Sequence, residues 1–124
     1  MTHWIDIEDR GTYVCVCFFG DWLKGEGESI LDEIFSAIVA SGHTKALVDY
    51  RKAGAMQSDS WMDFDEASHA SELPNVARYR FAVLFRADEL DRFRFWETVA
   101  LNRWIDMRFF SDEAEALQWL VSPG

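Results

Sequence analysis

The sequence is poor in basic residues and contains no long apolar run. Of its 124 residues, 12 are Lys or Arg and 22 are Asp or Glu, so the formal net charge at pH 7 is −10. Nucleic-acid binding draws most of its affinity from clustered Lys and Arg, and this charge therefore argues against a nucleic-acid partner. No run approaches the roughly 18 apolar residues that a membrane-spanning helix requires. The acidic N-terminal stretch MTHWIDIEDRG does not fit a signal peptide, so we expect a cytoplasmic protein.

Cysteine is scarce, with two residues in the whole chain, Cys15 and Cys17. In an extended strand their side chains project from the same face and run nearly parallel, which is poor geometry for a disulfide bond. A free cysteine packs as a small hydrophobic side chain. We therefore predict that both are reduced core residues.

The patterns that mark catalytic and metal sites are missing. His3, His43 and His69 have no spacing typical of metal ligands, and the cysteine pair supplies at most two ligands. There is no Gly-x-Ser-x-Gly nucleophile elbow and no Gly-x-Gly-x-x-Gly dinucleotide fingerprint. In the loop GDWLKGEGES, Glu28 follows Gly27 at the point where a phosphate-binding loop needs Lys and then Ser or Thr. The sequence thus predicts no metal, no cofactor and no enzymatic activity.

Material for a hydrophobic core, by contrast, is abundant. Apolar residues make up 49% of the chain and aromatic residues 15%. A chain of this length buries roughly two thirds of the surface that it exposes when unfolded. We predict one folded domain over residues 1–124.

Hydrophobic periodicity predicts the order β-β-α-β-α-β-α-β-α. Strands are expected over 3–9, 12–20, 45–50, 80–86 and 105–110, and helices from Ser29 to Gly42, from 58 to about 73, over 88–104, and from a cap at Ser111 or Asp112. Right-handed crossovers between these elements give an α/β sandwich. Its sheet has about five strands, mostly parallel, with the first strand antiparallel at an edge and four helices around it.

The helix expected over 88–104 carries more apolar side chains than one helical face needs. One stripe contains Leu90, Phe93, Trp96, Ala100, Leu101 and Trp104, which leaves Phe95 and Val99 outside it. The segment is also basic for this protein: residues 78–108 contain 7 Arg and 5 acids (+2), whereas residues 1–77 contain 5 bases and 14 acids (−9).

Two interpretations of this helix stay open. In the first, Phe93, Trp96 and Trp104 are core residues and the helix adds a homodimer contact. In the second, the apolar side chains that the core does not need bind a lipid, another apolar ligand or a membrane surface. The candidate contact residues are Arg92, Phe95, Trp96, Val99 and Trp104.

Three stretches, in this element order, resemble the SpoIIAA-like group of bacterial proteins, relatives of the STAS and SEC14-like folds. They are the strand ALVDY with Asp49 at its end, the strand RFAVLF and the ending FFSDEAEALQWL. The resemblance implies a SpoIIAA-like sandwich and a non-enzymatic binding or regulatory module. It also implies pairing, an apolar ligand or loose membrane association through the helix over 88–104.

The same resemblance supplies an alternative function. Anti-sigma-factor antagonists carry an Asp-Ser-Ser-Gly type motif in which a serine at a helix start is phosphorylated. Here the corresponding region is QSDSW, with Ser58 and Ser60 but no glycine. Asp59 and Asp63 would repel a phosphate group, whereas a serine that caps the helix stabilises it by about 1 kcal/mol. The sequence therefore favours capping, with a phosphoserine switch at Ser58 or Ser60 as the alternative.

Overall fold

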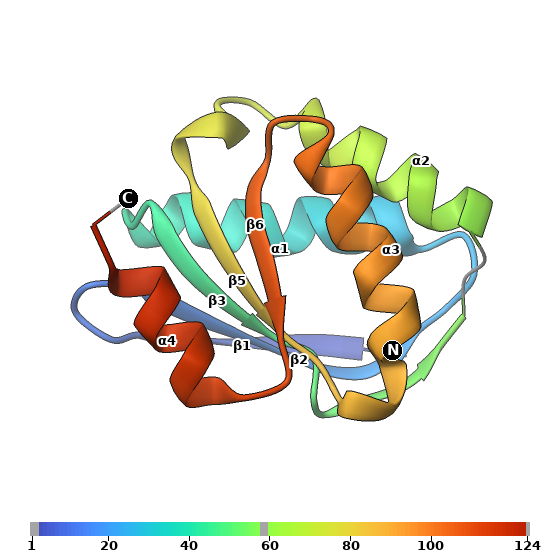
Figure 1. Cartoon of the computed structure of the whole chain (residues 1–124), viewed down its shortest axis with the longest axis horizontal. Coiled ribbons are helices and arrows are strands. Elements are labelled where there is room, and N and C mark those ends of the chain that lie inside the picture. The colour runs from blue at the N-terminus through green and yellow to red at the C-terminus, as the bar shows by residue number, and fades with distance from the viewer. Residues whose placement is uncertain (1–2, 58–59, 124) are drawn as a thin grey trace.

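The computed structural model describes residues 3–57 and 60–123, without the side chains of residues 60–64, 90 and 92. It confirms the predicted α/β sandwich (Figure 1). The strands are β1 (His3–Asp9), β2 (Val14–Trp22), β3 (Lys45–Asp49), β4 (Ala53–Met56), β5 (Arg80–Leu84) and β6 (Asp106–Phe110). The helices are α1 (Gly27–Ser41), α2 (Ser60–Ser71), α3 (Leu90–Leu101) and α4 (Glu113–Val121).

The sheet has the order β1-β2-β3-β5-β6, with β4 paired to the end of β2. β1 is antiparallel to β2 at one edge, as predicted, and all other pairs are parallel. From β2 through β3 and β5 to β6 the chain always advances in the same direction. Right-handed crossovers then place α1, α2 and α3 on one face of the sheet and leave the other face to α4. Figure 1 shows α4, in red, apart from the other three helices.

The sheet therefore separates two apolar clusters of unequal size. The larger one, under α1, α2 and α3, includes Val16, Phe18, Ile38, Val48 and Phe81. The smaller one, under α4, includes Cys15, Leu47, Leu84 and Leu120.

β4 makes this a six-stranded sheet in the described part of the chain, where about five strands were predicted. The residues of β4 are Ala-Gly-Ala-Met, which include no β-branched side chain and give no strand signal of their own. Contacts with the end of β2 fix the strand: Ala55 N–H donates to Asp21 Oδ1 at 2.9 Å, and Gln57 N–H donates to the Trp22 carbonyl at 2.7 Å. Tertiary pairing, rather than local preference, creates β4.

α1 differs from the prediction at its start and agrees at its end. It begins at Gly27 rather than after a Ser29 cap, and the Ser29 hydroxyl donates to the Glu26 carbonyl at 3.0 Å. Gly42 ends the helix with φ 82°, a left-handed conformation that glycine adopts without strain.

α3 is shorter than the predicted 88–104 helix because the chain must turn back to form β6. It ends at Leu101, and Ile105 is buried directly before β6. The turn between them puts Trp104 at φ 63°, where non-glycine residues are uncommon. The predicted apolar stripe therefore does not continue to Trp104.

The two cysteines are free, as predicted, but only Cys15 is a buried core residue, because Cys17 is half-buried. Both pack on the α4 side of the sheet. Burial raises the pKa of Cys15 to about 12, and burial together with the charge of Asp49 raises the pKa of Cys17. Both groups are thiols at neutral pH, so neither is an activated nucleophile.

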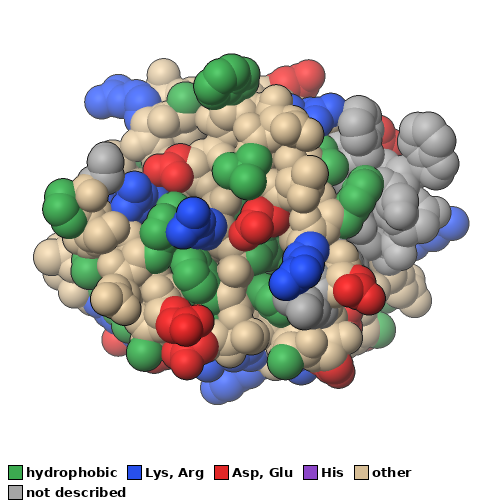
Figure 2. Space-filling model, in the orientation of Figure 1, with side chains coloured by type: hydrophobic (Ala, Val, Ile, Leu, Met, Phe, Trp, Pro, Cys, Tyr) green, Lys and Arg blue, Asp and Glu red, His purple; other side chains and the backbone are tan. Residues whose placement is uncertain are grey.

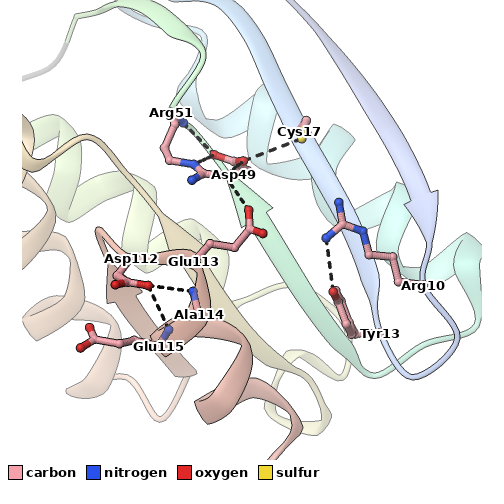
Figure 3. Close-up of polar contacts among 9 residues, drawn as sticks. All are labelled: Arg10, Tyr13, Cys17, Asp49, Arg51, Asp112, Glu113, Ala114 and Glu115. Atoms are coloured by element: carbon pink, nitrogen blue, oxygen red, sulfur yellow. Dashed lines mark hydrogen bonds and ion pairs between the residues drawn. The ribbon is translucent and has the colours of Figure 1, made fainter.

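Asp112, not Ser111, caps α4. One oxygen of its side chain accepts from Ala114 N–H at 2.8 Å and from Glu115 N–H at 3.3 Å (Figure 3). We expect Asp112→Ala to lower the free energy of unfolding by about 1 kcal/mol, because two N–H groups at the helix start lose their acceptor. Urea unfolding measures the loss. Ser111→Ala is the matched control, and an equal loss in that variant would contradict this assignment of the cap.

Candidate functional site

Polar side chains converge where β3 ends, around the buried carboxylate of Asp49 (Figure 3). Arg51 donates to this carboxylate through Nε at 3.0 Å, through Nη2 at 2.8 Å and through its backbone N–H at 2.9 Å. Arg51 Nη2 also donates to Glu113 Oε1 at 2.7 Å. The cluster ties the turn between β3 and β4 to the start of α4. It lies at the carboxyl end of a parallel strand, the edge at which α/β proteins place their sites.

The electrostatics of this cluster do not favour proton transfer. Burial alone would raise the pKa of Asp49, but the hydrogen bonds and charge of Arg51 outweigh burial and lower that pKa. Asp49 is thus a carboxylate at neutral pH. The Cys17 thiol lies 4.0 Å from Asp49 Oδ2, and its raised pKa keeps it protonated. These groups are arranged to hold the loop.

We therefore expect Asp49→Asn to lower the free energy of unfolding at pH 7 by about 2 kcal/mol, since Arg51 loses a charged, buried partner. Because folding lowers the pKa of Asp49, its contribution is present above the ordinary value near 4 and disappears as the pH falls through the lower folded-state pKa. The difference between wild type and variant should shrink accordingly below about pH 4. Urea unfolding at several pH values measures it.

Asp6→Asn, on the exposed side of β1, is the control for this experiment. Its stability should follow that of the wild type across the series. A constant gap between Asp49→Asn and wild type down to pH 2 would contradict the role assigned to the carboxylate.

Each histidine meets carboxylates of another part of the fold. His3 lies 3.0 Å from Glu33, and His43 lies 2.9 Å from Asp9. His69 bridges two residues of α1, with distances of 3.1 Å to Glu28 and 2.7 Å to Asp32. In the described part of the chain, no group of three His, Cys, Asp or Glu side chains is arranged to hold a metal ion.

The structure divides the candidate contact residues of the 88–104 segment between core and surface. Trp96 and Val99 are both 7% exposed, whereas Phe95 is 39% and Trp104 88% exposed. Val99 was predicted to lie outside the buried stripe, and that prediction is wrong. Arg92 lies in α3, but its side chain is among those not described. Ser58 lies outside the described residues, as does the side chain of Ser60, the first residue of α2.

Among the described side chains of α3, the exposed apolar residues do not form one patch. Phe95 and Leu101, both exposed, are separated by roughly 120° around the helix axis at about 100° per residue. Figure 2 shows hydrophobic side chains interspersed with charged ones on the visible face. Within the described residues, no helix has the length and apolar content needed to cross a membrane.

Sequence reasoning missed an apolar cavity of about 60 Å³ between the sheet and α1, α2 and α3. Trp22, Tyr50, Phe93 and Trp96 contribute rings to its wall, and Glu66 contributes a carboxylate. Apart from Phe93 and Trp96, which share α3, these residues come from separate segments, so no local motif could reveal the cavity. Glu66 is 4% exposed, and the only signal in the sequence was an acid between apolar positions of α2.

Solved structures share this fold, although no protein-family model and no curated protein matches the sequence. An anti-sigma factor antagonist from Mycobacterium paratuberculosis has a TM-score of 0.66 and 16% identity, with 98% of this chain and 96% of that chain covered. An uncharacterized protein with a SpoIIAA-like fold from Shewanella loihica PV-4 has a TM-score of 0.52 and 22% identity, with coverage of 96% and 93%.

The unphosphorylated anti-sigma factor antagonist SpoIIAA has a TM-score of 0.51 and 17% identity, with 94% of this chain and 95% of that chain covered. At sequence identities this low, the comparisons show only that the folds are alike. The chain has the SpoIIAA-like fold, as its sequence motifs predicted.

Proposed function

We propose that this chain is a non-catalytic regulatory module that acts by binding a protein partner. The observation that carries the proposal is the match to the Mycobacterium paratuberculosis protein, over 98% of this chain and 96% of that one. That protein and SpoIIAA are both anti-sigma factor antagonists, a name that describes action on another protein. A shared fold is an analogy for function, so the proposal needs its own experiment.

The polar chemistry of the described residues supports a binding role. The pKa of Cys17 is raised and that of Asp49 is lowered, which leaves a protonated thiol and an ion-paired carboxylate where a catalyst needs a nucleophile and a base. Arg51 holds Asp49 and Glu113 in fixed positions. Such a cluster shapes a surface and does not move a proton.

The finer form of this proposal is a switch by phosphorylation at Ser58 or Ser60. Its support is the resemblance of this region to the antagonist motif and the position of Ser60 at the start of α2. A helix start favours a phosphate through its free N–H groups and its dipole. The test is incubation with ATP and an extract of the source cells, followed by intact mass and peptide mapping.

The expected result is a gain of one phosphate in the wild type and no gain in the variant with both serines changed to alanine. Ser29→Ala is the matched control, because Ser29 lies in the first turn of another helix and should leave the modification intact. An unmodified wild-type protein would exclude the switch and leave the binding role standing.

We propose that the partner contact includes α3 and the turn that follows it, where Phe95 and Trp104 are exposed. Trp104 supports this most strongly, since it is 88% exposed and lies at a backbone conformation that bulky residues seldom adopt. The test compares the proteins that wild type and Phe95→Ser/Trp104→Ser capture from the source cells. Val39→Ser is the control, because Val39 is a similarly exposed apolar residue on α1.

A partner that is retained by wild type and Val39→Ser and lost by the double variant would support this contact. Equal capture by all three proteins would contradict it. A homodimer through the same residues remains a prediction. Light scattering across a concentration series tests it, with a dimer expected for wild type and a monomer for the double variant. Among the described side chains of α3, Phe95 and Leu101 lie on different sides of the helix and give no support to a lipid or membrane contact.

A further inference from the structure

β1 forms an edge of the sheet that is open to solvent (Figure 1). Five of its seven residues are exposed, and the large apolar side chains of Trp4 and Ile7 are each 53% exposed. Successive side chains of a strand point to opposite faces, so Trp4 and Ile7 lie on opposite faces of β1. An edge strand presents a row of unpaired N–H and C=O groups with which another strand can pair.

The register of β1 on β2 determines which backbone groups face outward. Arg10 N–H donates to the Tyr13 carbonyl at 2.9 Å, so these two residues form a hydrogen-bonded pair. In an antiparallel ladder such pairs alternate, and the register continues without a break along β1. The even-numbered residues of β1 therefore bond to β2, whereas Ile5 and Ile7 direct their N–H and C=O groups outward. In the described part of the chain, these outward groups meet no hydrogen-bond partner.

The other edges of the sheet are shorter and carry side-chain contacts. At β6, which has five residues, the N–H of Phe109 donates to Glu97 Oε2 of α3 at 2.7 Å. β4 has four residues, and its Ala53 carbonyl accepts a hydrogen bond from Arg86 Nη1. β1 is thus the edge that offers an added strand the longest free ladder.

The charge of β1 determines which kind of strand fits this edge. Glu8 lies 3.3 Å from Arg10, and Asp9 lies 2.9 Å from His43. Asp6 is exposed and forms no ion pair with a described residue. Residues directly opposite each other on neighbouring strands have Cβ atoms about 4.5–5.5 Å apart, and like charges in such pairs are destabilising. An added strand therefore needs basic side chains opposite Asp6 and Glu8.

A second copy of this chain does not meet that requirement. Outward-facing residues must pair with outward-facing residues, and full antiparallel overlap of β1 with its copy then places Asp6 directly opposite Asp6 of the second copy. A basic partner instead gains from this charge and from the net charge of −10 on the whole chain. The acids of β1 thus disfavour self-pairing and select a basic strand.

We propose that the edge of β1 binds an extended, basic segment of a partner protein, which joins the sheet as a further strand. The segment pairs antiparallel, the more stable direction per residue. Its apolar residues exchange backbone hydrogen bonds with Ile5 and Ile7, and its basic residues lie opposite Asp6 and Glu8. β1 and β6 are opposite edges of the sheet, and α3 packs on β6. The proposal is therefore independent of the contact proposed at α3.

The probe is the peptide TVRVKVT, blocked at both ends, in which valine alternates with arginine or lysine. An NMR titration of the whole chain gives its Kd, with the shift changes expected in β1. Hydrogen exchange is then measured at a peptide concentration of about ten times that Kd. The amides of Ile5 and Ile7 should exchange about tenfold more slowly, because the bound state alone protects them. The amide of Phe109, at the opposite edge, should exchange as before.

Two N-methylated peptides test the pairing itself. In an antiparallel pair, residues that exchange hydrogen bonds lie directly opposite each other and share a face. The valines, opposite Ile5 and Ile7, therefore direct their N–H groups toward β1, whereas the arginine and lysine direct theirs to solvent. Methylation of the valine nitrogens should abolish binding, and methylation of the arginine and lysine nitrogens should leave the Kd unchanged.

A charge reversal on β1 tests the selection of a basic strand. Asp6→Lys should raise the Kd of the peptide about tenfold, because the new lysine lies opposite a basic residue. Glu72→Lys is the matched control, since it changes the net charge by the same amount at an exposed acid beyond the end of α2. That variant should bind the peptide as the wild type does.

Four results would each overturn the proposal. The first is shift changes at β6 or α3 in place of β1, and the second is equal binding of the two methylated peptides. The third is an equal loss of affinity in Asp6→Lys and Glu72→Lys, which would reduce the effect to net charge. The fourth is slower exchange of Ile5 and Ile7 at high protein concentration without peptide, which would assign the edge to a second copy.

Discussion

Gly27→Ala is expected to lower the free energy of unfolding by about 2 kcal/mol, although alanine is the better helix former. At a helical position with free space, this change stabilises a protein by roughly 0.4–1 kcal/mol. At Gly27 the new Cβ atom would overlap Glu66 Oε2, and the Cδ and Cγ atoms behind it lie close as well. The carboxylate is enclosed and cannot move aside without losing its bond from Trp22 Nε1. A displaced, buried carboxylate accounts for the expected loss.

A double-mutant cycle with Glu66→Ala isolates this clash. When the Glu66 side chain is shortened, Gly27→Ala should cost nothing or become stabilising, because the space beside Gly27 is then free. Urea unfolding of the four proteins gives the coupling free energy. If Gly27→Ala cost the same in both backgrounds, the loss would come from the α1 backbone and not from Glu66.

Leu120→Ala is expected to lower the free energy of unfolding by about 3 kcal/mol. Leu120 of α4 is fully buried in the smaller cluster, where it packs with Leu47, Leu84 and Ala116. Removal of a buried leucine side chain loses its transfer free energy and leaves a cavity. α4 is the sole helix of the described chain on this face, so no neighbouring helix can move in to fill the space.

Val121→Ala is the matched control, because Val121 is adjacent in the sequence and 45% exposed. We expect that substitution to cost no more than about 0.5 kcal/mol. Arg80 should hold the end of α4 in place in both variants, since its Nη1 donates to the Trp119 carbonyl at 2.9 Å and to the Ser122 carbonyl at 3.1 Å. Similar losses in the two variants, measured by urea unfolding, would contradict the asymmetric burial of α4.

The contrast between Leu120 and Val121 also shows the limit of predicting buried residues from hydrophobic periodicity. Apolar residues at helical spacing after the cap, Ala114, Leu117, Leu120 and Val121, are the buried stripe that the sequence by itself predicts for this helix. In the structure Ala114 and Val121 are exposed, and Ala116 is buried. A short apolar helix offers more apolar positions than one sheet face can cover. Which of them are buried depends on how the helix is rotated on β3, β5 and β6, and that rotation is a property of the packed structure.

The candidate site was predictable to a lesser degree than the fold. The sequence identified α3 as rich in aromatic residues, yet it placed Val99 outside the buried stripe and Trp104 within it. The difference arises because α3 ends at Leu101 and the chain turns sharply into β6. Neither the cavity nor the role of Glu66 could be predicted, because Trp22, Gly27 and Glu66 belong to three different elements.

By itself, the sequence determined the alternation of strands and helices, the antiparallel edge strand, the reduced cysteines and the end of α1 at Gly42. These features depend on short-range periodicity and on backbone preferences, which act within a few residues. Only the tertiary structure decided the presence of β4, the end of α3 and the place of Glu66 at the start of α1. Each of these depends on segments that are distant in the chain and meet only when the sheet forms, so no local pattern carries the information.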